Sequence, residues 1–374
     1  MQIAPAQLEY WLRQYYFDTE IDLGCSGVAS FSMGELRELL GLAQQDLDAV
    51  VFRDSRTLGD PDLREAIARR WGGGDAERVM ATHGSSEAIY LIMRALLRPG
   101  DEVIVQSPAY QPLYSIAEAV GCELRHWRLD FERGFAPDMD ELRALINPKT
   151  RLVVANFPHN PTGATLTPGQ QQELLDAASR VGAYVLWDAA FAELVHDAPP
   201  LPDPGTRYDR AITIGTLSKA YGLPGLRVGW CLAAPDVLEE LVRLRDYITL
   251  HLSPLVELIG TRAVEHADVL LGIRLRQART NLDTFAGWAA EHRGVVEWVR
   301  PRGGVCVFMR LNGVPDVEEF CRQLAARHSV LLVPGSGFGE PGHVRLGFGG
   351  DVAEFNEGLA RLSSQLRREP VAAG

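Results

Sequence analysis

The feature that most constrains the fold is an alternation of short apolar runs with longer helical patterns through the middle of the chain. The runs are rich in β-branched residues, end near Pro, Gly, Asp or Ser, and cover residues 102–106, 151–157, 183–188, 211–216 and 227–233. Between them, residues 87–97 and 168–182 repeat apolar side chains at intervals of three and four. This rhythm predicts an α/β domain with a mostly parallel sheet covered by helices.

The pattern changes after about residue 255. Long helical stretches lead to short apolar runs at residues 304–311, 330–335 and 343–348, and then to a last helical pattern over residues 352–367. These features predict a smaller α+β domain. We therefore expect three parts: an N-terminal segment that packs with the small domain (1–50), a large α/β domain (51–255) and the small domain (256–374).

Composition narrows the class of function. The chain has 374 residues and 46% hydrophobic residues, which suffices for two buried cores. A net charge of -12 argues against nucleic acid and anionic membranes as partners. The five cysteines are scattered without a CxxC pair, so we expect neither disulfides nor a metal site. With no leader-like or membrane-spanning run, the sequence predicts a soluble, cytoplasmic protein that acts on a small molecule.

Lysine is rare in this chain, which contains only Lys149 and Lys219. Lys219 follows the apolar run 211–216 in a stretch of small residues, GTLSKAYGLPGLRVGW. An amine that attacks an aldehyde needs a desolvated, electropositive pocket, and Thr216, Ser218 and Arg227 are suited to bind a phosphate beside it. The segment predicts that Lys219 holds pyridoxal phosphate (PLP) as a Schiff base; an incidental loop lysine is the alternative.

Two further segments contain polar residues suited to a heterocyclic ring. Asp188 ends the run AYVLWD, where a carboxylate can pair with a pyridinium nitrogen or simply cap a helix. In NFPHNPTG, Asn160 can donate a side-chain hydrogen bond, while Pro161 and Gly163 shape the turn. A plain surface turn is the alternative for that segment.

Three other motifs are suited to a phosphate, a flat ring and a carboxylate. Gly84, Ser85 and Ser86 begin a helical pattern, where free N–H groups favour a phosphate, although a serine cap is also common. Tyr110 in QSPAY can lie against a flat cofactor or in the core. Arg345 in HVRLGF can bind a substrate carboxylate, or be an exposed arginine on a strand.

Taken in order, these motifs resemble the fold type I PLP enzymes of the aspartate aminotransferase superfamily over roughly residues 20–365. The resemblance implies that Lys219 carries PLP, that Asp188 faces the pyridine nitrogen and that Asn160 bonds the ring oxygen. It also implies a ring stacked on Tyr110, a homodimer, a substrate carboxylate on Arg345, and a phosphate site made of Ser85, Ser86, Thr216, Ser218 and Arg227.

The sequence departs from the superfamily pattern at two positions. Phe191 in DAAF stands where a tyrosine usually bonds the cofactor's phenolic oxygen. Asp54 stands at about the place of a tyrosine that usually reaches the neighbouring protomer, and an acid there is suited to a cationic substrate.

With these departures, the runs DLGCSGVASFSMGELREL, LWDAAFAELVHD and LSPLVE resemble the capreomycidine synthase family of antibiotic pathways. That resemblance implies conversion of (2S,3S)-3-hydroxyarginine into (2S,3R)-capreomycidine, by loss of water and intramolecular addition of the guanidine.

Other functions remain open from the sequence. An ordinary amino acid aminotransferase would share every cofactor residue. A PLP-binding transcriptional regulator is disfavoured because the chain is acidic and has no basic N-terminal helix-turn-helix module. A purely structural role would leave Lys219, Asp188, Asn160 and Arg227 together without a use.

Overall fold

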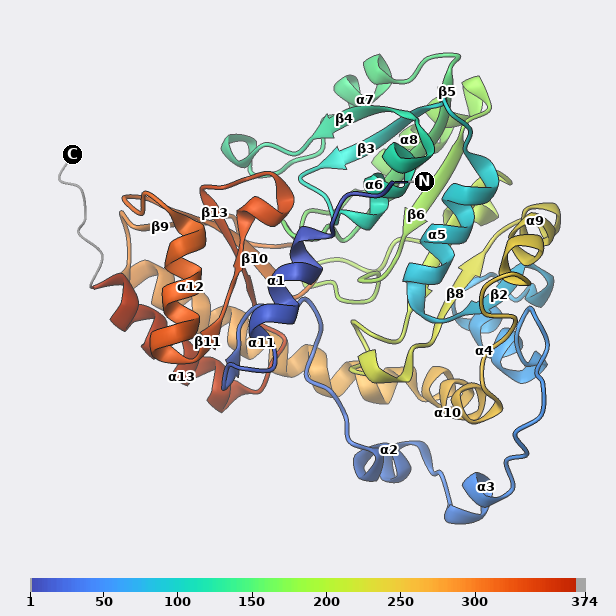
Figure 1. Ribbon diagram of the computed structural model, residues 1–374, viewed down its shortest axis with the longest axis horizontal. Coiled ribbons are helices and arrows are strands. Elements are labelled where there is room, and N and C mark those ends of the chain that lie inside the picture. Colours follow the sequence, from blue (N-terminus) through green and yellow to red (C-terminus); the bar gives the residue numbers. More distant parts are fainter. Residues whose placement is uncertain (1, 368–374) are drawn as a thin grey trace.

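The computed structural model of the protein describes residues 2–367, which form two main β-sheets with helices around them (Figure 1). The larger sheet runs in the order β2-β8-β7-β6-β5-β3-β4. Neighbouring strands from β7 to β4 are parallel, whereas β8 runs antiparallel to both β2 and β7. The strands are β2 (Val79–Thr82), β3 (Glu102–Ser107), β4 (Glu123–Arg128), β5 (Thr150–Asn156), β6 (Tyr184–Asp188), β7 (Ala211–Thr216) and β8 (Gly229–Leu232).

Helices cover both faces of this sheet. Val103 and Val105 of β3 pack in one buried cluster with residues of α5, α6 and α9, while Ile104 packs in another with residues of α7 and α8. The predicted α/β fold with a mostly parallel sheet is confirmed. The helices of this part are α4 (Pro61–Trp71), α5 (Gly84–Leu96), α6 (Pro112–Val120), α7 (Met139–Leu145), α8 (Pro168–Val181), α9 (Pro235–Arg245) and α10 (Pro254–Glu265).

The second sheet is antiparallel, in the order β12-β13-β10-β9. Its strands are β9 (Val296–Glu297), β10 (Cys306–Leu311), β12 (Val333–Pro334) and β13 (His343–Gly347). Around it lie α11 (Ala267–Glu291), α12 (Val317–His328) and α13 (Val352–Leu366). The predicted run 330–335 is divided, because β11 (Val330–Leu331) pairs instead with β1 (Ile21–Asp22) in a separate two-stranded sheet.

The N-terminal residues connect the parts of the fold. Helix α1 (Gln7–Tyr15) lies between the two main sheets, and the indole nitrogen of Trp11 donates to the carbonyl of Leu332 at 2.8 Å (Figure 1). Two short helices follow, α2 (Met33–Leu40) and α3 (Gln44–Asp48), and Gly41 ends the first with a φ of 62°. The domain boundaries at residues 50 and 255 stay predictions, and residues 368–374 of the predicted small domain lie outside the described part.

Candidate active site

A cavity of about 480 Å³ opens beside the carboxyl ends of β5, β6 and β7. Parallel strands bring their carboxyl ends to one edge of the sheet, so residues far apart in the chain meet there. Asp54 lies elsewhere. The predicted site residues that line the cavity together are Ser85, Ser86, Tyr110, Asn160, Asp188, Thr216, Ser218, Lys219, Arg227 and Arg345. Their chemical roles stay predictions.

Lys219 is half-buried just beyond the end of β7. Its Nζ donates to Oγ of Ser26 at 3.1 Å, and its carbonyl accepts from the N–H of Val28 at 3.0 Å. A β-carbon on Gly27 would lie 3.3 Å from the carbonyl oxygen of Ser218, so the two segments approach closely. The amine is therefore held by a hydroxyl from the N-terminal segment.

Asp188 ends β6 and is 5% exposed. Burial raises the pKa of its carboxyl to about 6, although the N–H of Ala190, 2.9 Å from Oδ1, and the nearby charge of Lys219 oppose this effect. A buried carboxylate of this kind gains from a cationic partner, because the partner compensates for lost hydration. The position fits the protonated nitrogen of a pyridine ring.

Arg227 and the start of α5 make a site suited to a phosphate. Arg227 has a φ of 56°, an unusual conformation for a residue with a β-carbon. Gly84 has a φ of 70°, and a β-carbon there would lie 2.4 Å from Nη2 of Arg227. Glycine at position 84 therefore lets the guanidinium approach the N-terminus of α5.

Hydroxyl groups surround the same place. The hydroxyl oxygens of Thr216 and Ser218 lie 2.9 Å apart. Nη1 of Arg227 lies 3.4 Å from the hydroxyl oxygen of Ser218. His83 supplies no side-chain cap to α5, whose first turn contains Ser85 and Ser86. Unbonded N–H groups at a helix start, hydroxyls and a guanidinium form the donor set that a phosphate dianion needs, and they fit the phosphate of PLP.

Arg345 on β13 is 1% exposed and orients Asn160. Its Nη1 donates to Oδ1 of Asn160 at 3.1 Å, and its Nη2 donates to the carbonyl of Gly24 at 2.8 Å. Asn156 fixes the backbone of Asn160, since its Oδ1 accepts from that N–H at 2.8 Å. With its oxygen bonded to Arg345, Asn160 is left with its amide nitrogen as a donor toward the cavity.

Among the polar residues of the cavity that sequence reasoning missed are Glu9, Cys25 and Ser26 of the N-terminal part. Glu9 comes from α1, and Cys25 and Ser26 come from the segment after β1, whose sequence resembled a family but singled out neither residue for a role. Phe191, noted from the sequence only as a departure, also lines the cavity. The one signal was the unusual run of small residues around Cys25 and Ser26.

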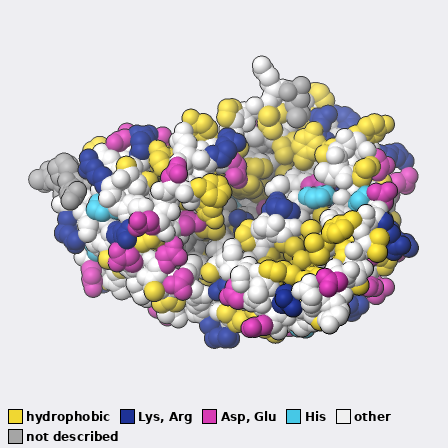
Figure 2. All heavy atoms as spheres, turned by 60° about the horizontal axis from the view of Figure 1, so that its bottom comes forward, with side chains coloured by type: hydrophobic (Ala, Val, Ile, Leu, Met, Phe, Trp, Pro, Cys, Tyr) yellow, Lys and Arg dark blue, Asp and Glu magenta, His cyan; other side chains and the backbone are white. Residues whose placement is uncertain are grey.

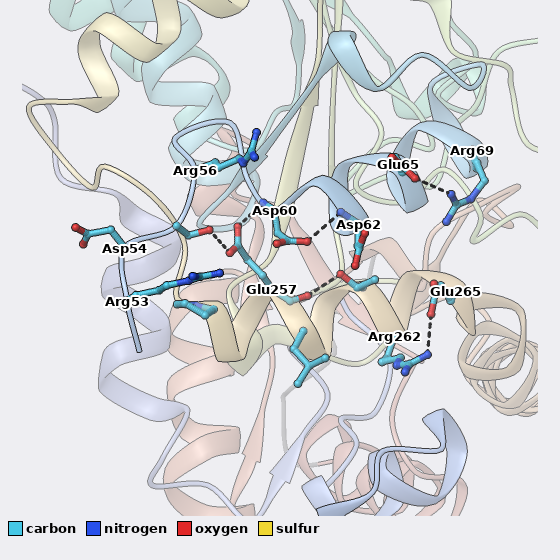
Figure 3. Close-up of a pocket in the computed structure, with 14 residues that line it drawn as sticks. Arg53, Asp54, Arg56, Asp60, Asp62, Glu65, Arg69, Glu257, Arg262 and Glu265 are labelled. Atoms are coloured by element: carbon cyan, nitrogen blue, oxygen red, sulfur yellow. Dashed lines mark hydrogen bonds and ion pairs between the residues drawn. The ribbon is translucent and has the colours of Figure 1, made fainter. Parts of the chain in front are cut away.

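Asp54 lies beside a different pocket, of about 670 Å³, between α4 and α10 (Figure 3). Its side chain is fully exposed, and Oδ1 lies 3.3 Å from Nε2 of His251. Glu257 of α10 accepts hydrogen bonds from the hydroxyl of Ser55 and, at 2.8 Å, from the N–H of Asp60, whereas Asp54 points outward in Figure 3. Asp54 is thus not among the residues that line the cavity around Lys219.

Residues 2–367 contain neither a candidate metal site nor a candidate membrane-spanning helix. No group of three or more His, Cys, Asp or Glu side chains there is placed to hold a metal ion. In the same residues, no helix is long and apolar enough to cross a membrane.

Comparisons with known proteins agree with this geometry. The family model for class I and II aminotransferases matches residues 42–362. A capreomycidine synthase from Streptomyces vinaceus is 51% identical over 97% of this chain and 94% of its own length. The arginine–pyruvate transaminase AruH of Pseudomonas aeruginosa is 31% identical over 82% of this chain and 80% of its own.

Solved structures agree as well. The crystal structure of the PLP-dependent cyclase OrfR superposes with a TM-score of 0.93, at 44% identity and over 99% of both chains. The resemblance drawn from the motifs is therefore confirmed, and this chain belongs to the class I and II aminotransferase family.

Proposed function

We propose that this protein uses PLP to convert (2S,3S)-3-hydroxyarginine into (2S,3R)-capreomycidine, a building block of peptide and streptothricin-type antibiotics. The observation that carries the proposal is the 51% identity to a capreomycidine synthase over 97% of the chain. When bound, PLP supplies an electron sink that acidifies the Cα hydrogen of the substrate and lets the β-hydroxyl leave.

Asp188, Asn160 and the phosphate site would hold the cofactor in one orientation. The carboxylate of Asp188 pairs with the ring nitrogen and keeps it protonated. Asn160 accepts a hydrogen bond from Arg345 through Oδ1, and its amide nitrogen donates to the ring oxygen. Tyr110 lies on the same cavity wall and is suited to stack on the ring.

Lys219 would move the proton at Cα. An amine that acts as a base must be partly neutral and held at the reacting carbon, and the hydroxyl of Ser26 orients it at 3.1 Å. Arg345 would bind the α-carboxylate of the substrate. With the amine of Lys219 and the α-carboxylate of the substrate both held in place, the substrate presents the same Cα hydrogen to Lys219 at each turnover.

Ring closure joins a guanidine nitrogen to the β-carbon of the same molecule, after the β-hydroxyl has left as water. All nitrogens stay in the product, and the overall change is the loss of one water. A confined cavity favours this step because the folded substrate keeps nucleophile and carbon together, which replaces a diffusional encounter.

The second candidate is an aminotransferase that acts on a cationic amino acid, favoured by the 31% identity to AruH. Purified holoenzyme should be incubated with 3-hydroxyarginine and, separately, with arginine, and the products identified by mass spectrometry. Cyclisation predicts a product from 3-hydroxyarginine that has lost one water and kept every nitrogen, with arginine unchanged. A keto acid, with the amino form of the cofactor, would assign the protein as an aminotransferase.

The assembly that we propose is a homodimer. Large apolar side chains are exposed on two segments that the contact between Asp54 and His251 brings together: Val51, Phe52, Tyr247, Ile248 and Leu250. Figure 2 shows hydrophobic side chains gathered around a hollow on one face of the molecule. An exposed apolar group of this kind is typical of a subunit interface. We place the protein in the cytoplasm, consistent with five free cysteines.

A further inference from the structure

Besides Asp188, the cavity contains a second acidic side chain, which no sequence motif predicted. Glu9 of α1 lines it together with Tyr110, whose hydroxyl donates to Oε1 of Glu9 at 3.1 Å. Within residues 2–367, no Lys, Arg or His side chain forms an ion pair with Glu9. The hydrogen bond from Tyr110 is the polar contact that fixes its carboxylate.

The other charged groups of the cavity already have partners of matching chemistry. Arg227 fits the phosphate, Arg345 fits the α-carboxylate and Asp188 fits the ring nitrogen. Lys219 is the amine that carries the cofactor. The carboxylate of Glu9 therefore remains for a cation, and the cation of a bound arginine derivative is its guanidinium.

Hydrogen bonds hold α1 on both sides of Glu9, at Gln7 and at Trp11. Near its start, the N–H of Gln7 donates to Oε1 of Gln111 at 2.8 Å, and Nε2 of Gln111 donates to the carbonyl of Pro5 at 2.9 Å. Further along, Trp11 donates to Leu332 beside the second sheet. A carboxylate on a helix held in this way loses little further freedom when a ligand binds.

Tyr110 keeps the carboxylate turned toward the cavity. Burial, and then the charge of Glu9, raise the pKa of the Tyr110 hydroxyl, so it stays protonated and continues to donate. The second oxygen of Glu9 and the remaining lone pair of the first stay available. Two carboxylate oxygens match two N–H groups of a guanidinium in a parallel pair of hydrogen bonds.

We infer that Glu9 binds the guanidinium of the substrate and makes the site specific for a cationic side chain. This deepens the proposed function and rests on it for the identity of the substrate. It gives Glu9, from the same chain, the part that the sequence suggested for Asp54. Glu9 acts on selection of the substrate and not on the proton transfers at Cα.

The test compares ligands of the same shape with and without charge. Arginine and its uncharged urea analogue citrulline both lack the β-hydroxyl, so each can be titrated into the holoenzyme and followed by the visible absorbance of the cofactor. We expect wild type to bind arginine more tightly. Glu9→Gln should weaken arginine binding about 10- to 100-fold, the effect of losing a charge-assisted pair, and leave citrulline binding nearly unchanged.

Two variants serve as controls. Asp18→Asn removes an equal charge from an exposed residue just after α1 and outside the cavity, and should bind both ligands as wild type does. Glu9→Asp keeps the charge on a shorter stem and should retain part of the preference. Thermal unfolding of each variant shows whether the fold is preserved.

Three results would overturn the inference: no preference for arginine in wild type, a preference that survives Glu9→Gln, or equal losses for both ligands in that variant. Loss of the preference in Asp54→Asn alone would move the role to the neighbouring protomer. Turnover of 3-hydroxyarginine is measured separately. A keto acid product would refute the proposed cyclisation, whereas a loss of preference specific to Glu9→Gln would still support guanidinium binding.

Discussion

The guanidinium of Arg345 joins Asn160 to Gly24, with Nη1 3.1 Å from the side-chain oxygen of the first and Nη2 2.8 Å from the carbonyl of the second. One buried side chain of the second sheet thereby orients a residue on the turn after β5 and also the N-terminal segment. The donor proposed for the cofactor and the group proposed for the substrate carboxylate are therefore coupled.

Arg345→Lys should damage the site although the charge is kept. A single ammonium cannot make the same forked contacts with Asn160 and Gly24 and also bind a carboxylate, so we expect KM for 3-hydroxyarginine to rise about 10- to 100-fold. Steady-state kinetics measure this effect. Arg310→Lys, in a partly exposed ion pair with Glu132, is the matched control and should change KM little. Equal effects of the two substitutions would contradict the assigned role.

Lys219→Ala should abolish the covalent cofactor. Because the chain contains one other lysine, the exposed Lys149, the experiment has a natural control in Lys149→Ala. After borohydride reduction, we expect a cofactor-labelled peptide from wild type and from Lys149→Ala, and none from Lys219→Ala. Peptide mass spectrometry makes the distinction, and a label retained in Lys219→Ala would refute the assignment.

Asp188 should make the cofactor-free protein less stable as the pH rises. Its pKa is raised from 3.8 to about 6 in the folded state, so between these values the folded protein holds more protons than the unfolded chain. The free energy of unfolding therefore falls as the pH rises through that window, and above it the ionised carboxylate costs about 3 kcal/mol. The contribution is absent at lower pH, where the carboxyl is protonated in both states.

Asp188→Asn removes this cost. Urea unfolding of the cofactor-free variant should show a gain of about 1–3 kcal/mol over wild type near pH 7.5, and the gain should vanish near pH 4. The same variant should bind PLP more weakly, because the ring nitrogen loses its ionic partner. A gain in stability that is independent of pH would disprove the electrostatic origin.

Tyr247→Glu should weaken self-association. Tyr247 is 91% exposed beside other large apolar side chains, and a charge there would have to be buried at the proposed interface. Sedimentation velocity should show the dissociation constant of the dimer rising at least about tenfold. Val269→Glu, at an exposed position on α11, is the control. A monomer in both wild type and variant would exclude the proposed dimer.

Sequence patterns could bring several residues of the cavity together because these residues end a strand, follow one or begin a helix. Asp188 ends β6, Lys219 follows β7 and Ser85 begins α5, so local patterns and the parallel sheet together imply that they meet. The strand β4 was missed because it is mostly exposed and polar, ELRHWR, and shows no apolar run. Sequence reasoning also missed β2, because this strand is only four residues long.

The residues that reach the cavity from α1 and from the segment after β1 could not be found from sequence patterns. Glu9 meets Tyr110 across 101 positions of the chain, and Ser26 meets Lys219 across 193. No periodicity of the sequence can reveal such a contact, because the contact depends on where the N-terminal segment lies relative to the two sheets. The pairing of β1 with β11 is part of what places that segment. The division of residues 330–335 between two sheets has the same long-range cause.

The placement of α1 has an evolutionary consequence. The residues suited to PLP lie within 85–227, whereas the acidic side chain from α1 enters the cavity on a short, separately tethered helix. Given the role inferred for Glu9, replacement of this helix during evolution should change selectivity and leave the residues suited to PLP in place. Chimaeras that swap residues 2–17 among relatives would show whether side-chain selectivity moves with this helix.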